Sequence, residues 1–415
     1  MARLTPLTAA ATLFFVFASA GGNDANASTG LVTAWTQLGP DGAVIARAIT
    51  ADATCPDAIL DENTTTMQVR AGPAKGFPNT VCELTIKPDT ESLRVGDFEL
   101  PLLAEDPKKV VVIGDTGCKV EQDEIQDCSD PAAWPFQTIA QQAAAIEPDL
   151  IVHVGDIVYR EAPCPAGDGR CPGSPVGSTW ASNNADFFTP VGNALQSAPW
   201  LFSRGNHENC QSAENGAGWF RYYDPYPYPA ACSDYTPMFS LPLGNRQIVV
   251  IDASARNTGE VDPTVVAQYR PEFAALPDLV GNTPTWFVTH APMWAFIAFN
   301  KGGKQIQVVN TVNLQEASGN SLPKGIEVVL SGGTHGAQFL EFADGRPPQV
   351  VSGNSGDLLD PPLKQPLAGT PIAGTTIKSG FSAAVFGYSV LERSDDRWTI
   401  TFFGVGGNVL YNGSI

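Results

Sequence analysis

Short runs of apolar residues recur between residues 108 and 330, and each run ends in a cluster of polar side chains. The runs occupy 110–113, 150–154, 200–202, 248–251, 286–288 and 328–330. Continuous apolar runs of this length are typical of strands that are buried on both faces of a sheet. The segment 134–146 has helical periodicity, with Pro135 near the helix start, where proline is tolerated. This alternation predicts an α/β domain.

The residues before 108 have a different sequence pattern. Runs at 42–50, 65–71 and 81–86 hold β-type residues and are broken by Gly, Pro, Asn and Asp. The segment 100–107 has the composition of a linker. At 415 residues the chain is long enough for two domains. We therefore expect a small β-sandwich-like domain over 28–105 and an α/β domain over 108–415.

The first residues have the pattern of a secretory signal peptide. Arg3 precedes an apolar stretch at 7–17, and Ala18-Ser19-Ala20 is a small-x-small cleavage site. The predicted signal peptide covers 1–20, or extends to 27 if cleavage follows Ala25-Asn26-Ala27. The apolar stretch is shorter than the roughly 18 residues that a membrane span needs. No later segment is long enough, and the C-terminus has no lipid-anchor signal, so we expect no stable membrane anchor.

Cysteine usage agrees with export. Eight cysteines form an even set, and disulfides persist outside the cytoplasm. They occur in successive pairs around short loops, which favours pairing between nearest neighbours. A zinc knuckle is the alternative, but no CxxC spacing is present. The expected pairs are Cys55–Cys82, Cys118–Cys128, Cys164–Cys171 and Cys210–Cys232. We expect a secreted or periplasmic protein.

Charge narrows the range of partners. The formal net charge is −19 and the sequence pI is about 4.5. A strongly acidic protein repels nucleic acid and anionic membranes, so neither is an expected partner. The sequence makes no prediction of the oligomeric state.

Candidate chemistry lies at the ends of five apolar runs. Because ligands of α/β folds bind beyond the carboxyl ends of the strands, these clusters would share one crevice. Three of the chain's four histidines belong to them. The clusters are Gly114-Asp115-Thr116-Gly117, Gly155-Asp156-Ile157-Val158-Tyr159, Gly205-Asn206-His207-Glu208, Val288-Thr289-His290 and Ser331-Gly332-Gly333-Thr334-His335.

Two carboxylates, an amide oxygen and imidazoles in one pocket indicate a metal site. Buried carboxylates cost several kcal/mol each to desolvate unless a cation compensates them. Ligand sets of oxygen and nitrogen suit Zn, Fe or Mn. Each residue has an ordinary alternative: an Asp or Asn206 in a turn, Tyr159 in packing, and His153 as a hydrogen-bonded core or supporting histidine. The joint, ordered pattern favours the metal site.

The order D-x-G, G-D-x-x-Y, G-N-H-E, V-x-x-H and a final G-x-x-H-like element resembles the purple acid phosphatases. These are a group of calcineurin-like metallophosphoesterases, and the resemblance covers about residues 109–356. It implies a two-sheet sandwich flanked by helices, a dinuclear metal centre, and hydrolysis of a small phosphorylated substrate, a phosphate monoester. A small N-terminal β domain also occurs in the larger family members.

The resemblance also implies a role for each matched residue. Asp115, Asp156, Tyr159 and His335 would hold a first metal, Fe(III). Asp156 would bridge to a second metal, Zn, Mn or Fe(II), which Asn206 and His290 would complete. His207 would be catalytic and, with Asn206, would bind the substrate phosphate. The two ions would activate a water for attack on phosphorus and stabilise the developing charge.

Two departures from the family pattern keep other functions open. Gly333 stands where the G-H-x-H motif has a histidine that would bind the second metal. The stretch 293–300 lacks the substrate-contacting histidines of the plant enzymes, and we expect an aromatic lining there instead. The alternatives are a phosphodiesterase or nucleotide hydrolase on the same fold, or a catalytically weak phosphate- or metal-binding protein. Asn354 is expected in a turn, with a place at the border of the site as the alternative, and the loop 160–184 is expected to shape substrate access.

Overall fold

The structure is a computed structural model that describes residues 30–122, 124–210, 215–254, 260–395 and 397–415. The predicted signal peptide, with either of its cleavage sites, lies outside the described residues. Within these ranges no helix is both long enough and apolar enough to cross a membrane.

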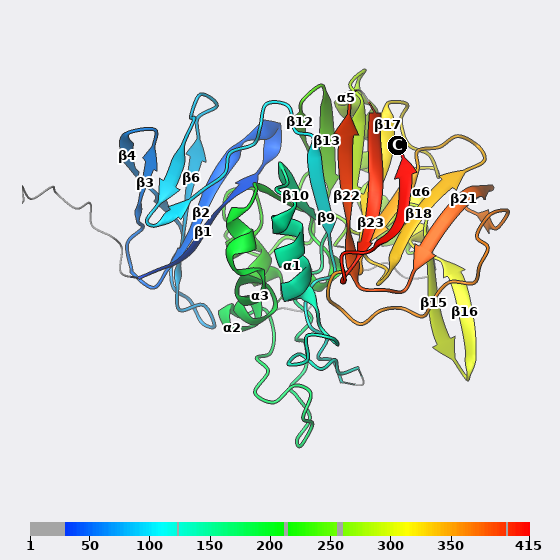
Figure 1. Ribbon diagram of the computed structural model, residues 1–415, viewed down its shortest axis with the longest axis horizontal. Helices are drawn as coiled ribbons and strands as arrows, with labels where there is room; N and C mark the ends of the chain where they lie inside the picture. The colour runs from blue at the N-terminus through cyan, green and yellow to red at the C-terminus, as the bar shows by residue number, and fades with distance from the viewer. Residues whose placement is uncertain (1–29, 123, 211–214, 255–259, 396) are drawn as a thin grey trace, which may run out of the picture.

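Two large sheets pack face to face at the centre of the molecule (Figure 1). In spatial order, the ten-stranded sheet holds β24 (Val409–Ser414), β23 (Arg397–Gly404), β22 (Gly387–Ser394), β9 (Lys109–Ile113), β10 (Leu150–His153), β11 (Trp200–Phe202), β1 (Leu31–Leu38), β2 (Val44–Thr50), β6 (Thr80–Ile86) and β5 (Gln68–Ala71). The eight-stranded sheet holds β12 (Phe239–Leu243), β13 (Arg246–Ile251), β14 (Thr285–Thr289), β17 (Ile326–Ser331), β19 (Gln349–Ser352), β18 (Ala337–Phe342), β21 (Thr375–Ala383) and β20 (Pro371–Ile372).

Alternate residues of the central strands fill two different cores. Val110 and Val112 of β9 point between the sheets, where they join Ile248 and Val250 of β13 in one apolar cluster. Val111 points to the opposite face, into the cluster that holds α1 (Phe136–Ala145). On the far side, α5 (Pro263–Val280) packs on the eight-stranded sheet. The predicted two-sheet sandwich flanked by helices is confirmed.

The six apolar runs found in the sequence lie in β9, β10, β11, β13, β14 and β17, and the predicted helix contains α1. The parallel neighbours β9, β10 and β11 lie in one sheet, while β13, β14 and β17 lie in the other. The sequence did not predict α5, because Pro271 and Pro277 lie inside this helix of 18 residues and proline normally ends one.

The N-terminal region is β-rich as predicted and has a core of its own between two sheets, one of which continues into the following domain. Its strands β1, β2, β6 and β5 extend the ten-stranded sheet, and β1 pairs in parallel with β11. A second, small sheet holds β4 (Asn63–Thr66), β3 (Asp57–Leu60), β7 (Leu93–Val95) and β8 (Phe98–Glu99). The run of β-type residues at 65–71 belongs to two strands, β4 and β5, because the chain changes sheets at the buried Met67. The domain boundary near 105–108 stays a prediction.

Buried arginines reinforce this junction. Arg47 donates to the carbonyl oxygens of Tyr222 and Asp224, at 3.0 and 2.7 Å. Arg70 donates to the carbonyl oxygens of Phe220 and Tyr226 and lies 2.8 Å from a carboxylate oxygen of Glu83. The N-terminal strands are thereby tied to the segment 220–226 of the following domain.

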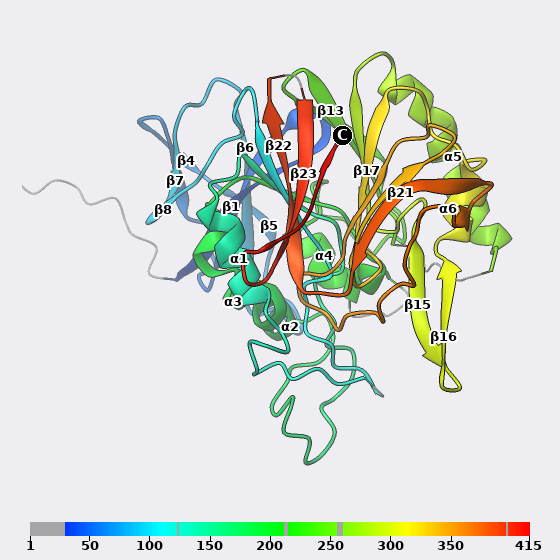
Figure 2. The same cartoon turned by 45° about the vertical axis from the view of Figure 1, so that its right-hand side comes forward.

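The remaining elements lie around the sandwich. A two-stranded hairpin projects beyond its edge, formed by β15 (Phe296–Lys301) and β16 (Lys304–Val309) and seen in yellow in Figure 2. The other helical segments are α2 (Trp180–Asn183), α3 (Thr189–Val191), α4 (Asn215–Tyr222), α6 (Val312–Ala317), a π-helical turn (Asn184–Phe188) and short 3-10 turns at Pro40–Gly42, Gly192–Gln196 and Asn206–Glu208.

Four disulfides close the loops of the chain. They join Cys55–Cys82, Cys118–Cys128, Cys164–Cys171 and Cys210–Cys232, so all four predicted pairs are confirmed. Two of them lie in the loops that project below the sandwich in Figures 1 and 2. These disulfides indicate an oxidising environment.

Candidate metal centre

Five strand ends from the two sheets converge at one edge of the sandwich. Asp115 follows β9, Asp156 follows β10, Asn206 follows β11, His290 follows β14, and His335 lies in the turn after β17. Asp115, Asp156 and His290 are buried and place one ligand atom each within 4.8 Å of one another. The structure therefore brings the predicted ligands of both sheets together.

The two aspartates have an unusual backbone. Asp115 and Asp156 have φ angles of 54° and 56°, in the left-handed region that non-glycine residues rarely adopt. Their loops bind each other: the N–H of Asp115 donates to the carbonyl of Gly155 at 2.9 Å, and that of Thr116 donates to Asp156 at 3.0 Å. Such strain persists only where the surrounding structure holds it, and it is common at functional sites.

The phenol oxygen of Tyr159 lies at the centre of one group of donors. It is 3.0 Å from Oδ1 of Asp115, 2.9 Å from Oδ2 of Asp156 and 3.1 Å from Nε2 of His335. The side chain of Tyr159 is fully buried. These four residues are the ones that the sequence assigns to a first metal.

His290 is the centre of the second group. Its Nε2 lies 3.1 Å from Oδ2 of Asp156 and 3.1 Å from Oδ1 of Asn206. The same oxygen of Asp156 therefore contacts Tyr159 on one side and His290 on the other. This is the position that a bridging carboxylate needs.

The orientation of both imidazoles fits metal binding. Nδ1 of His290 lies 2.8 Å from the carbonyl oxygen of Val154, and Nδ1 of His335 lies 2.9 Å from that of Leu358. Because a carbonyl oxygen accepts only from a protonated nitrogen, each Nδ1 carries the proton. In each neutral ring the lone pair of Nε2 is then directed into the site.

The charges of the site also fit a cation. Burial raises the pKa of Asp115 to about 7 against the opposing effects of His290 and His335, and Asp156 adds a smaller upward contribution. Burial lowers the pKa of His290, but the carboxylate of Asp156 outweighs it and the pKa lies near 10. His290 thus compensates the charge of Asp156, whereas the buried carboxylate of Asp115 lacks full compensation, as expected of a ligand to a cation. The oxygen and nitrogen donors of the site suit Fe, Zn or Mn.

His207 lies next to the carboxylate of Asp156. Its backbone N–H donates to Oδ1 of Asp156 at 2.9 Å, and its ring lies 4.2 Å from that of Tyr159 between centroids. Nδ1 is 2.6 Å from a carboxylate oxygen of Glu161, while Nε2 is 3.8 Å from Asp156. Burial lowers the pKa of His207, but Asp156 and Glu161 raise it to about 9.

Three carboxylates support the site without having been predicted. Glu208 is buried and accepts from the N–H groups of Gly205, Asp156 and Ile157, at 3.1, 3.1 and 2.7 Å. Asp186, in the π-helical turn, accepts from the N–H of Tyr159 at 3.1 Å. Glu208 ends the G-N-H-E cluster and Glu161 closely follows Tyr159, so local sequence could have indicated both. Nothing local points to Asp186.

Gly333 has no side chain to offer the second metal. Its φ is +69°, and its N–H donates to both carboxylate oxygens of Asp115, at 3.2 and 3.1 Å. A Cβ at this position would lie 3.2 Å from Nε2 of His290. The position therefore faces the second group of donors, as the sequence alignment with G-H-x-H requires.

The expected aromatic lining at 293–300 was wrong in part. Met293 and Trp294 are buried in the core of α5, and the Trp294 indole donates to Asn320 at 2.9 Å. Phe296, Ile297 and Ala298 instead line a narrow crevice beside His335. Within β15, Phe296 is buried and Phe299 is exposed, because residues three positions apart in a strand point to opposite faces.

The other residues singled out in the sequence lie around the site. His153 is buried, and its Nε2 is 2.9 Å from Oγ1 of Thr116, so its supporting role is confirmed. Asn354 is buried and donates to the carbonyl of Val385 at 2.8 Å, without contacting the predicted ligands. The loop that begins at Arg160 borders a hollow of about 520 Å³ lined by Glu121, Gln122, Glu124, Glu161 and Ala162.

Comparisons with known proteins agree with this geometry. Residues 108–337 match the family description of the calcineurin-like phosphoesterases. A purple acid phosphatase from yellow lupin seeds (Lupinus luteus) has a similar structure, with a TM-score of 0.58 and 15% identity over 93% of this chain and 74% of that one. The structure of PhoD is also similar, with a TM-score of 0.53 and 11% identity over 95% and 90% of the two chains. No curated protein sequence matches this chain.

Proposed function

The chain belongs to the calcineurin-like phosphoesterase family of metal-dependent hydrolases, and from this membership we propose that it hydrolyses phosphate monoesters outside the cytoplasm. The observation that carries the proposal is the tyrosine in the ligand set. The Tyr159 oxygen lies within 3.1 Å of donor atoms of Asp115, Asp156 and His335. A phenolate in this position is the feature that sets the purple acid phosphatase pattern apart.

The proposed first metal is Fe(III), held by Asp115, Asp156, Tyr159 and His335, because phenolate and carboxylate are hard donors. The second metal would be Zn, Mn or Fe(II), held by Asp156, Asn206 and His290. When bound, the two ions would act as Lewis acids toward the phosphate and lower the pKa of a water.

The chain's own residues would orient the substrate. The side chain of His207 is 17% exposed, faces the open side of the site and is fixed through Nδ1 by Glu161. From there its Nε2 would donate to a phosphate oxygen or protonate the leaving group. The hollow beside Glu161 leaves room for the leaving group on this side of the site.

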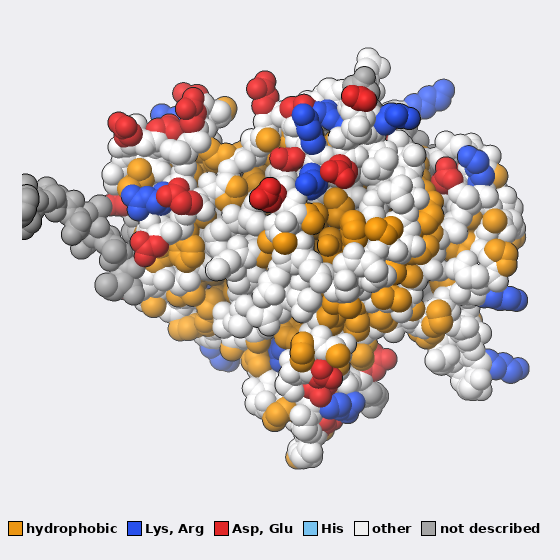
Figure 3. Space-filling view, in the orientation of Figure 1, with side chains coloured by type: hydrophobic (Ala, Val, Ile, Leu, Met, Phe, Trp, Pro, Cys, Tyr) orange, Lys and Arg blue, Asp and Glu red, His pale blue; other side chains and the backbone are white. Residues whose placement is uncertain are grey.

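Export is the second part of the proposal. Four disulfides join all eight cysteines of the chain. Disulfides are rare in the reducing cytoplasm and frequent in secreted and periplasmic proteins. Together with the predicted signal peptide, they support a secreted or periplasmic location. On the face drawn in Figure 3, acidic side chains gather over the N-terminal strands, and acidic and basic side chains are mixed along the upper edge.

Loading the purified protein with iron and zinc tests the activity and the first metal together. The wild type should hydrolyse p-nitrophenyl phosphate with a higher kcat/KM than bis(p-nitrophenyl) phosphate, and should show a visible phenolate-to-iron absorption band. Asp156→Ala should lose the band, the metal and the activity, because Asp156 contacts both groups of donors. Tyr159→Phe should lose the band and keep part of the activity.

The control is Asp89→Ala, which removes an exposed carboxylate from the turn after β6 and should change nothing. An Asp156→Ala protein with more than a tenth of the wild-type kcat/KM, equivalent to about 1.4 kcal/mol of transition-state stabilisation, would contradict the dinuclear assignment. Preference for the diester would identify a phosphodiesterase on the same fold.

A further inference from the structure

A buried pair of opposite charges lies behind the proposed first metal. Asp357 lies in the turn after β19, and its side chain is fully buried. Lys119 follows Asp115 by four residues, and its side chain is only 9% exposed. Their Nζ and Oδ2 atoms are 3.8 Å apart. Neither residue belongs to the sequence motif of the site.

Asp357 faces the imidazole of His335. Its Oδ1 accepts from the N–H of Leu358 at 2.7 Å, and its Oδ2 lies 3.3 Å from Nδ1 of His335. Within the described part of the chain, Oδ2 has no hydrogen-bond partner. The same Nδ1 lies 2.9 Å from the Leu358 carbonyl, so two acceptors stand on one edge of the ring. Both acceptors favour a proton at Nδ1, so the unprotonated Nε2 of His335 points toward Tyr159.

Asp357 is also linked to another predicted ligand through the backbone. Its N–H donates to the carbonyl oxygen of Asp115 at 2.8 Å. Asp115 lies at the end of β9, whereas His335 lies after β17 in the other sheet. Asp357 therefore touches one proposed ligand from each sheet.

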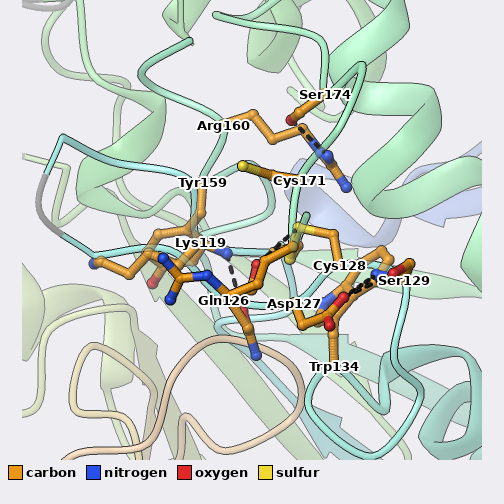
Figure 4. The surroundings of a disulfide bond; sticks show 12 residues. Lys119, Gln126, Asp127, Cys128, Ser129, Trp134, Tyr159, Arg160, Cys171 and Ser174 are labelled. Atoms are coloured by element: carbon orange, nitrogen blue, oxygen red, sulfur yellow. Dashed lines mark hydrogen bonds between the residues drawn. A yellow bond between two sulfur atoms is a disulfide. The ribbon is translucent and has the colours of Figure 1, made fainter. Parts of the chain in front are cut away.

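Lys119 supplies the compensating charge. Its Nζ lies 3.1 Å from Glu121 and 3.5 Å from Glu124, and it stands 5.2 Å from the centre of the Tyr159 ring. Figure 4 shows Lys119 and Tyr159 in the same neighbourhood as Gln126, which accepts from the Lys119 N–H at 2.9 Å. A buried carboxylate without a partner would cost several kcal/mol, so the ammonium group makes the charged form of Asp357 tolerable.

We propose that Asp357 is a positioning residue for the first metal and that Lys119 is its counterion. Together with the carbonyl of Leu358, the carboxylate of Asp357 favours the Nδ1-protonated tautomer of His335, and so raises the metal affinity of the site whose ligands are Asp115, Asp156, Tyr159 and His335. This inference rests on the proposed function for the presence of the metal. It differs from a merely structural ion pair, which would affect folding and leave metal affinity unchanged.

Zinc affinity distinguishes a positioning role of Asp357 from a merely structural ion pair. Protein is stripped of metal, and Zn²⁺ binding is measured by competition with a chromophoric chelator for wild type and Asp357→Asn. Losing such a partner typically weakens metal binding about 10–100-fold. We expect a loss of this size for the tighter of the two zinc ions and no change for the other. The melting temperature of both metal-free proteins is measured as well, to show whether the substitution affects folding.

Asp360→Asn is the matched control. Asp360 lies on the same turn and accepts from the backbone N–H of His335 at 2.9 Å, so it contacts the backbone of the same histidine. This variant should bind zinc as the wild type does.

A double variant separates charge compensation from positioning. Lys119→Met alone should lower the melting temperature of the metal-free protein, because it leaves Asp357 without a counterion. Adding Asp357→Asn should restore the melting temperature while zinc binding stays weak. Unchanged zinc affinity in a folded Asp357→Asn protein would overturn the positioning role and leave the proposed function standing. A wild type that binds no zinc would overturn both.

Discussion

At Gly333 a side chain would point toward the imidazole of the proposed second metal. The Cβ of such a side chain would lie 3.2 Å from Nε2 of His290 and 3.1 Å from its carbonyl oxygen. The backbone there has a φ of +69°, which costs a residue with a Cβ roughly 1–2 kcal/mol. Two consequences of a substitution, metal binding and strain, are therefore expected at this one residue.

We predict that Gly333→His increases the affinity for the second metal ion and lowers the melting temperature of the protein. The affinity should rise about tenfold or more. Loss of a residue that hydrogen-bonds a metal ligand weakens metal binding about 10–100-fold, and a direct ligand should matter at least as much. Calorimetric zinc titration and a melting curve measure the two effects.

Gly333→Ala is the matched control for this prediction. It brings the same backbone strain without a donor atom, so it should lower the melting temperature and leave zinc binding weak. A well-folded Gly333→His protein with unchanged affinity for the second ion would show that the new imidazole does not reach the metal.

At the scale of single elements, α5 carries a carboxylate in an unfavourable place. Glu272 lies on this helix, and its Oε2 has no hydrogen-bond partner within the described ranges. Burial, with a smaller effect of Asp252, raises the pKa of Glu272 to about 7. Because the folded state then binds this proton more tightly than the unfolded state, the contribution of Glu272 to stability falls as pH rises from about 4.5 to 7.

We predict that Glu272→Gln stabilises the protein at pH 8 and has little effect at pH 4.5. The expected gain in unfolding free energy at pH 8 is roughly 1–2 kcal/mol, after allowance for solvent screening of a partly exposed side chain. Urea unfolding of both proteins at the two pH values measures it. Equal stability differences at both pH values would mean that Glu272 titrates normally in the folded protein.

At the scale of the whole molecule, the ten-stranded sheet connects the N-terminal region (28–105) to the domain that follows it (108–415). The parallel pair of β1 and β11 joins them, and Arg47 and Arg70 bind carbonyls of the segment 220–226. No disulfide crosses residue 105, since Cys55–Cys82 lies before it and the others lie after it. Apart from the polypeptide chain itself, only noncovalent contacts hold the two regions together.

We predict that residues 108–415 expressed alone do not form a soluble monomer. Removing β1 leaves β11 as an exposed edge strand, and unpaired edges favour aggregation. Size-exclusion chromatography and circular dichroism measure the outcome, and coexpression of residues 28–105 should recover soluble protein. A monomeric fragment that binds zinc like the full chain would show that the N-terminal strands are dispensable.

Local sequence patterns were enough to predict the central strands and the kind of chemistry at the site. Apolar runs predicted β9, β10, β11, β13, β14 and β17 because strands buried on both faces leave an unbroken apolar signature. The clusters after these runs predicted the donor atoms at the site, since strand ends must carry them in an α/β fold. Short loops between successive cysteines predicted all four disulfides.

The distant residues that support that chemistry could not be identified from local sequence, because folding brings them to the site. Asp186 contacts Tyr159, and Asp357 contacts His335, from segments whose local sequence shows no metal-site pattern. The joining of β1 to β11 depends on contacts between residues 163 positions apart, Gln37 and Trp200, and no periodicity within either strand encodes such a pairing. Local pattern reports what a segment buries, whereas the partner that covers it is set by the packing of the whole chain.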